Sequence, residues 1–404
     1  MKGDVRCLNC GQTIPPGVNN CPSCARWRQR ALRQDTILIL CLPVMAVLFV
    51  ITGFAVKVHG AKRQALADQW SRQGEKDLKS GHPLAAVDDF RTGLLYSQDN
   101  GPLQLQLAGA LFAANRAGEA RDYLLRLWED NPADGAVNLE LGRIALRNGN
   151  VTQAIRYYHS AIDGVWPGGA EAHRRPIRKE LYEALISRGF RTEALAELVV
   201  LSEETPDNAG LRAEVGSLFM QAHDYDAALK QFQRATGLDH RLEAAWKGAG
   251  ESAYQMGDYR LARRYLLRAL ALDARDNQVA EMLNTSDFVL EIDPFSPHLP
   301  TADRRKRVIH AYHQALTRLK ACAQSQGQTL TASTASTPLQ TVYSAAVKLN
   351  SNATDSALRR DPDLEDTLMG QAFQMEQAAA KACGAPKGLD LAILLIAQRN
   401  GGPH

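Results

Sequence analysis

Two different patterns of apolar residues run along the chain. Residues 36–56 (TILILCLPVMAVLFVITGFAV) form one continuous run of 21 residues that contains no charge. Between residues 67 and 276, small and large apolar residues recur among polar ones with a period of 34 residues. The first pattern predicts a helix with apolar surroundings on every side, and the second predicts an array of packed helices.

The apolar run predicts a transmembrane helix at residues 36–56. At a rise of 1.5 Å per residue it spans about 31 Å, which matches a hydrocarbon core of about 30 Å. A cleaved signal peptide is the alternative, but the run is long, a cysteine-rich module precedes it and no small-x-small cleavage site follows it. We therefore expect a single membrane crossing, preceded by a basic juxtamembrane segment at residues 26–35.

Copies of the repeating pattern begin at residues 67, 101, 135, 175, 209 and 243. The copy that begins at residue 135 is the clearest, with characteristic residues Leu141, Gly142, Ala145, Ala154, Tyr158 and Ala161. Small residues recur where the two helices of one copy must approach closely, and large residues fill the gaps between copies. Six extra residues interrupt the spacing near Gly164–Pro176, where the sequence WPGG predicts a loop.

The period and these positions resemble the tetratricopeptide repeat (TPR), and the resemblance covers about half of the chain. It implies an all-α fold in which six TPR-like repeats at residues 67–276 wind into a right-handed solenoid. In this family the first helix of each repeat lines a concave face that binds a peptide or a partner helix. The candidate groove residues on that face are Leu105, Phe112, Leu139, Arg143, Leu146, Arg147, Lys179, Glu183, Ile186, Met220, Gln221, Lys247 and Glu251. The alternative is that they coat a solvated groove or contact only adjacent helices.

Four cysteines near the N-terminus form two Cys-x-x-Cys pairs, Cys7 with Cys10 and Cys21 with Cys24. Two such turns facing each other complete a tetrahedral site of four thiolates for zinc. The string CLNCGQTIPPGVNNCPSC resembles bacterial zinc-ribbon modules, which predicts a small zinc ribbon at residues 1–25. Four thiolates leave no position for water, so the zinc is expected to be structural. Two redox dithiols or two disulfides are the alternatives.

Thiolate ligands need a reducing compartment, which predicts a cytosolic N-terminus. The repeats then lie across the bacterial inner membrane, in the periplasm or another extracytoplasmic space. Basic residues flank both ends of the apolar run, so their bias supports this topology only weakly. Residues 1–35 carry a net charge of +4, while the whole chain carries +3. The remaining residues therefore sum to −1 and are nearly neutral. A nearly neutral bulk argues against a nucleic-acid partner.

Residues 277–404 lose the period and predict a capping helix followed by a C-terminal helical domain. The expected helices are 277–291, 304–323, 339–349, 364–383 and 389–398. Cys322 and Cys383 are the only cysteines after the apolar run. In an oxidising space such a pair is expected to form a disulfide; two unrelated buried thiols are the alternative.

The sequence contains no Walker loop, no G-x-S-x-G and no H-E-x-x-H motif, so we expect neither an enzyme nor a small-molecule substrate. The predicted function is a membrane-anchored scaffold for protein–protein interaction, which presents its repeat groove across the membrane from the zinc ribbon. A transmembrane signal transducer, which couples an outside ligand to a cytosolic effector through the ribbon, is the alternative. An enzyme hidden in the C-terminal helices is a third hypothesis.

Overall fold

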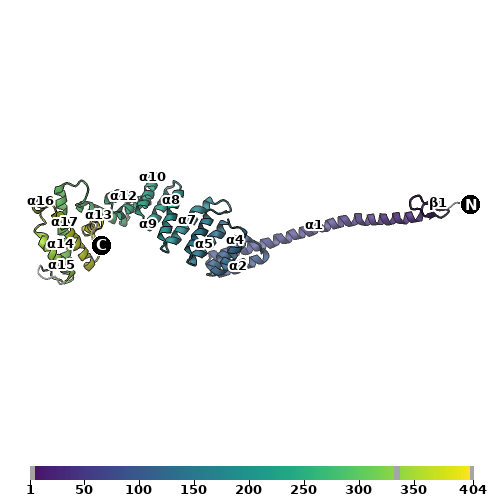
Figure 1. Cartoon of the computed structure of the whole chain (residues 1–404), viewed down its shortest axis with the longest axis horizontal. Coiled ribbons are helices and arrows are strands. Elements are labelled where there is room, and N and C mark those ends of the chain that lie inside the picture. Colours follow the sequence, from purple (N-terminus) through teal and green to yellow (C-terminus); the bar gives the residue numbers. More distant parts are fainter. Residues whose placement is uncertain (1–4, 332–336, 401–404) are drawn as a thin grey trace. The chain divides into compact units, whose positions relative to one another are not determined.

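The computed structural model describes residues 5–331 and 337–400, without the side chains of residues 27 and 29–43. The elements of the described chain are helices, apart from one small sheet at its start (Figure 1). It divides into two compact units, one that ends at Ala170 and one that begins at Glu171. The predicted all-α repeat fold is confirmed.

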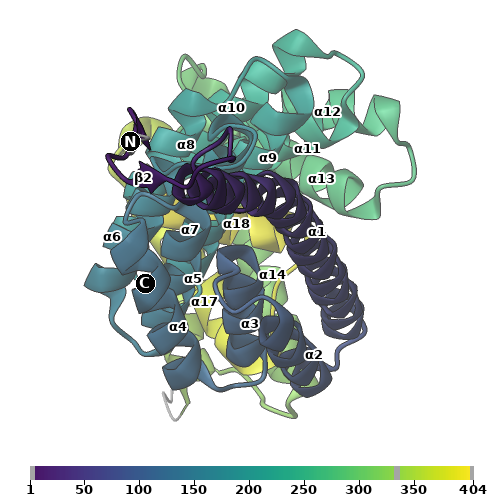
Figure 2. The ribbon, with the colours of Figure 1, turned by 90° about the vertical axis from the view of Figure 1, so that its right-hand side faces the viewer.

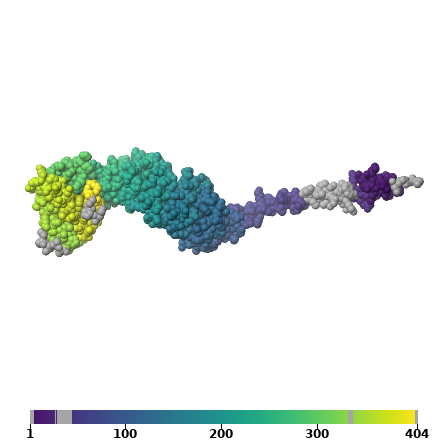
Figure 3. Space-filling model, in the orientation of Figure 1, coloured from purple at the N-terminus to yellow at the C-terminus, as the bar shows by residue number. Residues whose placement is uncertain are grey.

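The first unit begins with a two-stranded antiparallel sheet of β1 (Val5–Arg6) and β2 (Thr13–Ile14). The helix α1 (Pro22–Lys79) follows and continues for 58 residues. Its described apolar part, from Val44 onward, includes an 18-residue stretch with a mean hydropathy of 1.9, and none of these residues is buried. Figure 3 shows this part of α1 with no other element packed around it. The side chains of residues 36–43, in the first part of the predicted span, lie outside the described ones.

The same helix forms the first half of the first repeat, together with α2 (Pro83–Tyr96). Gly74 of α1 contacts the Phe90 ring so closely that an added Cβ would lie 2.7 Å from it. The sequence pattern predicts the apolar run and the first repeat as separate elements, but no break separates them. The reason is that residues 57–66 contain no proline and only one glycine, so nothing in this stretch ends a helix.

Two further repeats complete the first unit. Their helix pairs are α3 (Gly101–Ala113) with α4 (Ala117–Asp130), and α5 (Gly135–Arg147) with α6 (Val151–Ile162). The side-chain oxygens of Asn100 and Asp134 accept hydrogen bonds from the first free backbone N–H groups of α3 and α5. These caps explain why both helices begin at the predicted copy starts. Figure 2 labels the four helices of these two repeats.

The six-residue insertion makes a loop after α6, as expected, but the loop is shorter than the range 164–176. Val165 pairs with the chain before α5, where its N–H donates to Ala133 O (2.8 Å) and its carbonyl accepts from Gly135 N (3.0 Å). The Trp166 indole N–H donates to Ala161 O (2.8 Å). The loop is therefore fixed against α5, and the next helix already begins at Glu171.

The second unit contains three more repeats. Its helix pairs are α7 (Glu171–Ile186) with α8 (Arg191–Glu204), α9 (Ala209–Gln221) with α10 (Tyr225–Leu238), and α11 (Glu243–Gln255) with α12 (Tyr259–Leu272). Small residues again allow close approach, since a Cβ on Gly248 would lie 2.3 Å from the Phe232 ring. The helices α9 and α11 begin at the predicted copy starts.

After the repeats, α13 (Asn277–Ile292) packs against a bundle of five helices. They are α14 (Thr301–Ser325), α15 (Pro338–Asn350), α16 (Asp355–Arg360), α17 (Leu364–Cys383) and α18 (Gly388–Arg399). Val289 and Ile292 of α13 share one core with Tyr312 and Met375 of the bundle. The bundle and α13 are therefore one packed structure. The short α16 is missing from the sequence prediction.

Candidate metal centre and interaction surfaces

The four N-terminal cysteines are placed by one turn and one helix start. After β1, the Gly11 N–H donates to Cys7 O (2.9 Å), and Gly11 has φ 74°, a left-handed conformation that glycine adopts at low cost. The second pair lies at the N-terminus of α1, where Cys21 is the N-cap residue and Pro22 opens the helix. Helix N-termini favour negative groups, so this position suits thiolates.

The arrangement of the sulfur atoms fits a zinc ion. All four Sγ atoms lie within 4.8 Å of one another. The Cys7 and Cys24 sulfurs lie 3.8 Å apart, and the Cys10 and Cys21 sulfurs 3.5 Å apart. Zn–S bonds of ~2.3 Å in a tetrahedron require sulfur atoms ~3.8 Å apart. The four cysteines are free thiols in the structure, and their donor set matches a structural zinc site.

The thiols also influence one another's ionisation. Backbone N–H groups of Asn9 and Cys10 lower the pKa of Cys7 to about 7. The side chain of Cys10 raises the pKa of Cys24 to about 12. Without a bound cation, it is therefore unfavourable for all four thiols to be deprotonated together near neutral pH. A bound cation removes that penalty, because it compensates the negative charge of the thiolates.

A hollow of about 300 Å³ opens on the first helices of repeats one to three. Its lining residues are Glu75, Leu78, Phe90, Leu105, Gln106, Gly109, Ala136, Leu139, Glu140 and Trp166. The walls are mostly apolar, and two carboxylates stand among them. Gln106 joins the first two repeats, since its Nε2 donates to Glu75 Oε1 (2.6 Å) and its Oε1 accepts from Ser71 (2.7 Å).

Of the predicted groove residues in the first unit, Leu105 and Leu139 line this hollow. Arg143 pairs with Glu140 (2.6 Å) at its edge. Phe112 and Arg147 contact each other instead: the guanidinium lies 3.6 Å from the ring centroid and donates to Phe112 O (2.7 Å).

The prediction that Leu146 lines the groove is wrong. Leu146 is only 4% exposed, because it points into the helix packing rather than into the groove, and it is unavailable to a partner. Glu75 and Gly109 line the hollow but were not predicted, although both occupy the ninth position of their copies, as Arg143 does. The repeat register could therefore have found them. Trp166 lies in the insertion loop, which is outside the repeating pattern, so the pattern could not have predicted its position.

The predicted groove residues of the second unit mostly contact neighbouring repeats. Lys179 lies 2.5 Å from Glu214 and 3.7 Å from Glu183. Lys247 pairs with Asp276 (2.7 Å). These ion pairs use charges that would otherwise face a partner.

The remaining predicted residues of that unit differ in exposure. Ser252 Oγ lies 3.1 Å from the Met220 sulfur, so half-buried Met220 contacts the next repeat. Ile186 is half-buried and Gln221 is exposed. Burial raises the pKa of Glu251.

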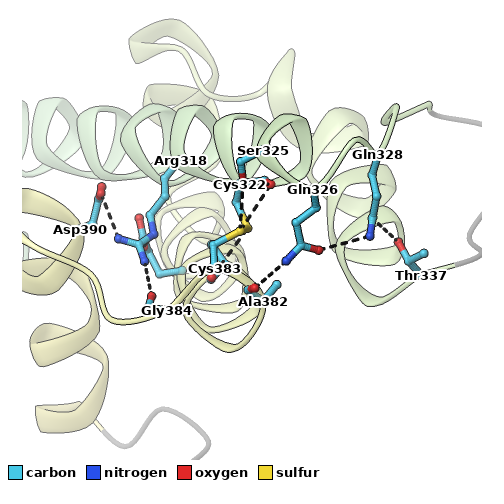
Figure 4. Close-up of a disulfide and its surroundings, with 12 residues drawn as sticks. Arg318, Cys322, Ser325, Gln326, Gln328, Thr337, Ala382, Cys383, Gly384 and Asp390 are labelled. Carbon is cyan, nitrogen blue, oxygen red and sulfur yellow. Dashed lines mark hydrogen bonds and ion pairs between the residues drawn. A yellow bond between two sulfur atoms is a disulfide. The ribbon is translucent and has the colours of Figure 1, made fainter.

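In the bundle, Cys322 and Cys383 form a disulfide (Figure 4). It joins α14 to the last residue of α17 with a Cα–Cα distance of 5.8 Å, inside the range that a disulfide bridges. Cys322 is 5% exposed, whereas Cys383 is exposed. The Gln326 side-chain amide donates to Ala382 O beside the bond (2.5 Å), so the same two helix ends are also held by a hydrogen bond.

Comparison with known proteins supports the repeat assignment. Tetratricopeptide repeat family models match residues 77–139 and 216–277. No curated protein matches the chain in sequence. Tetratricopeptide repeats imply a protein–protein interaction scaffold, and proteins built from them are typically not enzymes.

Several solved repeat structures are similar to the chain. The C-terminal part of a TPR repeat-containing protein from Cytophaga hutchinsonii is 13% identical, with 80% of this chain and 98% of that one covered and a TM-score of 0.40. The pilF structure from Pseudomonas aeruginosa is 13% identical, with 55% and 97% covered and a TM-score of 0.36. PilW, a type IV pilus biogenesis factor, is 13% identical, with 54% and 98% covered and a TM-score of 0.36. These scores are too low to transfer a function.

Proposed function

We propose that the chain is a single-pass scaffold of the bacterial inner membrane. In this proposal α1 crosses the membrane at residues 36–56, and the four N-terminal cysteines hold a structural zinc ion in the cytosol. The repeats and the C-terminal bundle lie on the periplasmic side, where the groove holds a protein partner. The observation that carries the proposal is the open, mostly apolar hollow on repeats one to three.

The lining of that hollow indicates what kind of segment it accepts. Leu78, Leu105 and Leu139 offer apolar contact, while Glu75 and Glu140 bring two carboxylates. Arg143 is the one cation paired with them in the described contacts, through Glu140. A peptide or partner helix with an apolar anchor beside a basic residue fits this combination, because apolar burial supplies affinity and charge supplies orientation.

The two kinds of cysteine support the proposed topology. Four free thiols precede the exposed apolar part of α1, and a disulfide lies far after it. Thiolate zinc sites need a reducing compartment and structural disulfides an oxidising one. A membrane between the two groups satisfies both requirements.

A transmembrane signal transducer is the second candidate, and one observation favours it. Because α1 runs unbroken from Pro22 to Lys79, the same helix carries Cys24 and packs in the first repeat. A change at either end can therefore be passed along one helix. Deleting residues 1–25 distinguishes the two functions. If the chain is a transducer, this deletion should cause as strong a defect as deletion of the whole gene. If it is a scaffold, the defect should be weaker.

The groove can be tested by crosslinking in intact membranes. A photoreactive amino acid at Gly109 points into open space in the groove, since nothing lies within 4 Å of an added Cβ. Gly118 on α4 is the matched control, with equally open surroundings outside the hollow. We expect a partner to crosslink from Gly109 and not from Gly118, and the crosslink to disappear with Leu139→Glu. Equal crosslinking from both positions would contradict the proposed groove.

The topology has its own test. A reporter enzyme that is active only in the cytosol, fused after His404, is expected to be silent. An active reporter would mean that the repeats are cytosolic. The two groups of cysteines would then lie on the same side of the membrane, which would contradict the proposed topology.

A further inference from the structure

The exposed face of α12, the second helix of the sixth repeat, is unusually basic. Its buried residues are Tyr259, Ala262, Tyr265, Leu266 and Ala269. Its exposed residues include Arg260, Arg263, Arg264 and Arg268, and the helix contains no acidic residue. The corresponding helix α4 of the second repeat instead mixes two arginines with Glu119, Asp122, Glu129 and Asp130. The charge of α12 is therefore a local feature and not a property of the repeat.

Three of these arginines are left without a counter-charge. Arg263 is neutralised by Asp287 (2.5 Å). Arg260, Arg264 and Arg268 form no ion pair within residues 5–331 and 337–400. They recur every fourth residue, so they lie along one side of the helix at intervals of about 6 Å. We call these three residues the arginine stripe.

Aromatic rings and a leucine accompany the arginine stripe. The Arg264 guanidinium lies 5.5 Å from the Tyr265 ring centroid, and that of Arg268 lies 5.8 Å from the Trp246 ring. Contact with a ring holds a guanidinium extended while leaving N–H groups free to donate. Leu267, between two of the arginines in sequence, is 42% exposed. The surface thus combines free cations with apolar area.

We propose that the arginine stripe binds an acidic, amphipathic helix of a partner protein, at a site distinct from the groove. Carboxylates at every fourth residue of such a helix match the spacing of the three arginines. Guanidinium groups pair with carboxylates through two parallel hydrogen bonds. Leu267 requires an apolar side chain opposite it, which favours an amphipathic helix over a purely charged polyanion. The hollow lies on the first three repeats and the arginine stripe on the second helix of the sixth, so the two sites share no residue.

The test uses the full-length chain in detergent micelles. The probe is a synthetic helical peptide with glutamate at every fourth position and leucine beside it, and the matched peptide has glutamine in place of glutamate. The variant carries Arg260→Gln, Arg264→Gln and Arg268→Gln. The control carries Arg121→Gln, Arg126→Gln and Arg156→Gln, which are exposed on second helices of other repeats.

We expect the glutamate peptide to bind the unaltered chain, and to bind it more weakly as salt is added. The stripe variant should lose about tenfold or more in affinity, because three charge pairs are removed, and the control should change little. Equal binding by both variants, or equal binding of both peptides, would overturn the proposal. So would binding to phosphatidylglycerol vesicles that is lost in the stripe variant while the peptide does not bind, since the ligand would then be a lipid headgroup. Crosslinking from Gly109 is unaffected by any of these results, so the two proposals fail separately.

Discussion

The chain uses the same residue type in two opposite ways. The four cysteines before the apolar part of α1 are free, and their sulfurs gather within 4.8 Å of one another. The two cysteines of the C-terminal bundle are joined to each other. Spacing explains the difference, because Cys-x-x-Cys pairs present thiolates from one turn, whereas Cys322 and Cys383 are 61 residues apart and meet only after the bundle folds.

The two regions also differ in what else holds them together. The strands β1 and β2 have two residues each, and Leu8 and Val5 of this region are exposed. So small a structure has no core of its own and depends on a metal. The C-terminal bundle buries residues such as Tyr312, Leu319 and Met375, so its disulfide adds to an existing core. We therefore expect that loss of the metal unfolds the N-terminal region completely, whereas loss of the disulfide only lowers the stability of the bundle.

The largest effect is expected at the cysteine cluster. Replacing Cys10 with Ser removes one of four ligands and should take the metal content of the full chain from about one zinc to nearly none. Structural zinc sites of this kind contribute about 10–16 kcal/mol to folding, so residues 5–24 should become protease-sensitive. Elemental analysis and limited proteolysis measure both outcomes.

Ser23→Ala is the control for that experiment, because Ser23 lies between two of the cysteines and offers no sulfur. It should retain zinc. Helicity should stay unchanged in both variants, since the repeats have their own cores. A Cys10→Ser chain that still binds one zinc as tightly would contradict a four-thiolate site.

A smaller effect is expected at the disulfide. Replacing Cys322 and Cys383 together with Ser should lower the free energy of unfolding of the bundle by about 4 kcal/mol, since the bond closes a loop of 61 residues in the unfolded chain. Denaturant unfolding measures the loss, and the Cys10→Ser variant is its control, with no change expected. Free alkylation of both cysteines before any reduction would contradict the bond itself.

The sequence predicted the repeats well because their signals are local and recur. Asn100, Asp134 and Asn208 cap the first helices of their copies, so the register also fixes where α3, α5 and α9 begin. The helix α17 begins and ends at the predicted residues, 364 and 383. The pattern does not predict the unbroken course of α1, because hydrophobicity changes after Val56 although no helix-ending residue stands there.

Side-chain availability was harder to predict than helix positions. Leu146 falls on the expected face but packs inside, and Lys179 and Lys247 pair with residues about one repeat further along the chain. These outcomes depend on the angle between successive repeats, which a single sequence does not specify. Trp166 enters the hollow from a loop, where no periodic signal exists.

The smallest effect concerns pH and again separates the two regions. In the bundle, Glu376 is fully buried (0% exposed), and Arg318 Nε lies 3.1 Å from its Oε2. Arg318 is shared with Asp390 (3.2 Å), which also accepts from Gln314 (2.8 Å). Burial, together with the nearby charge of Asp390, raises the pKa of Glu376 from about 4.5 to about 8, although Arg318 opposes the shift.

A pKa that is higher in the folded chain makes stability fall as pH rises, because the unfolded chain releases the proton first. Glu376 should therefore lower the free energy of unfolding of the bundle by about 2 kcal/mol between pH 6 and pH 8. The loss should begin above about 4.5, the value in the unfolded chain, and level off above about 8. Glu376→Gln should remove this slope, and Asp366→Asn, exposed on the same helix, should keep it. The zinc site should respond in the opposite direction, since acid protonates its thiolates and releases the metal. Denaturant unfolding of the bundle at pH 6 and pH 8 measures the slope, and an equal slope in the Glu376→Gln chain would mean that another group is responsible.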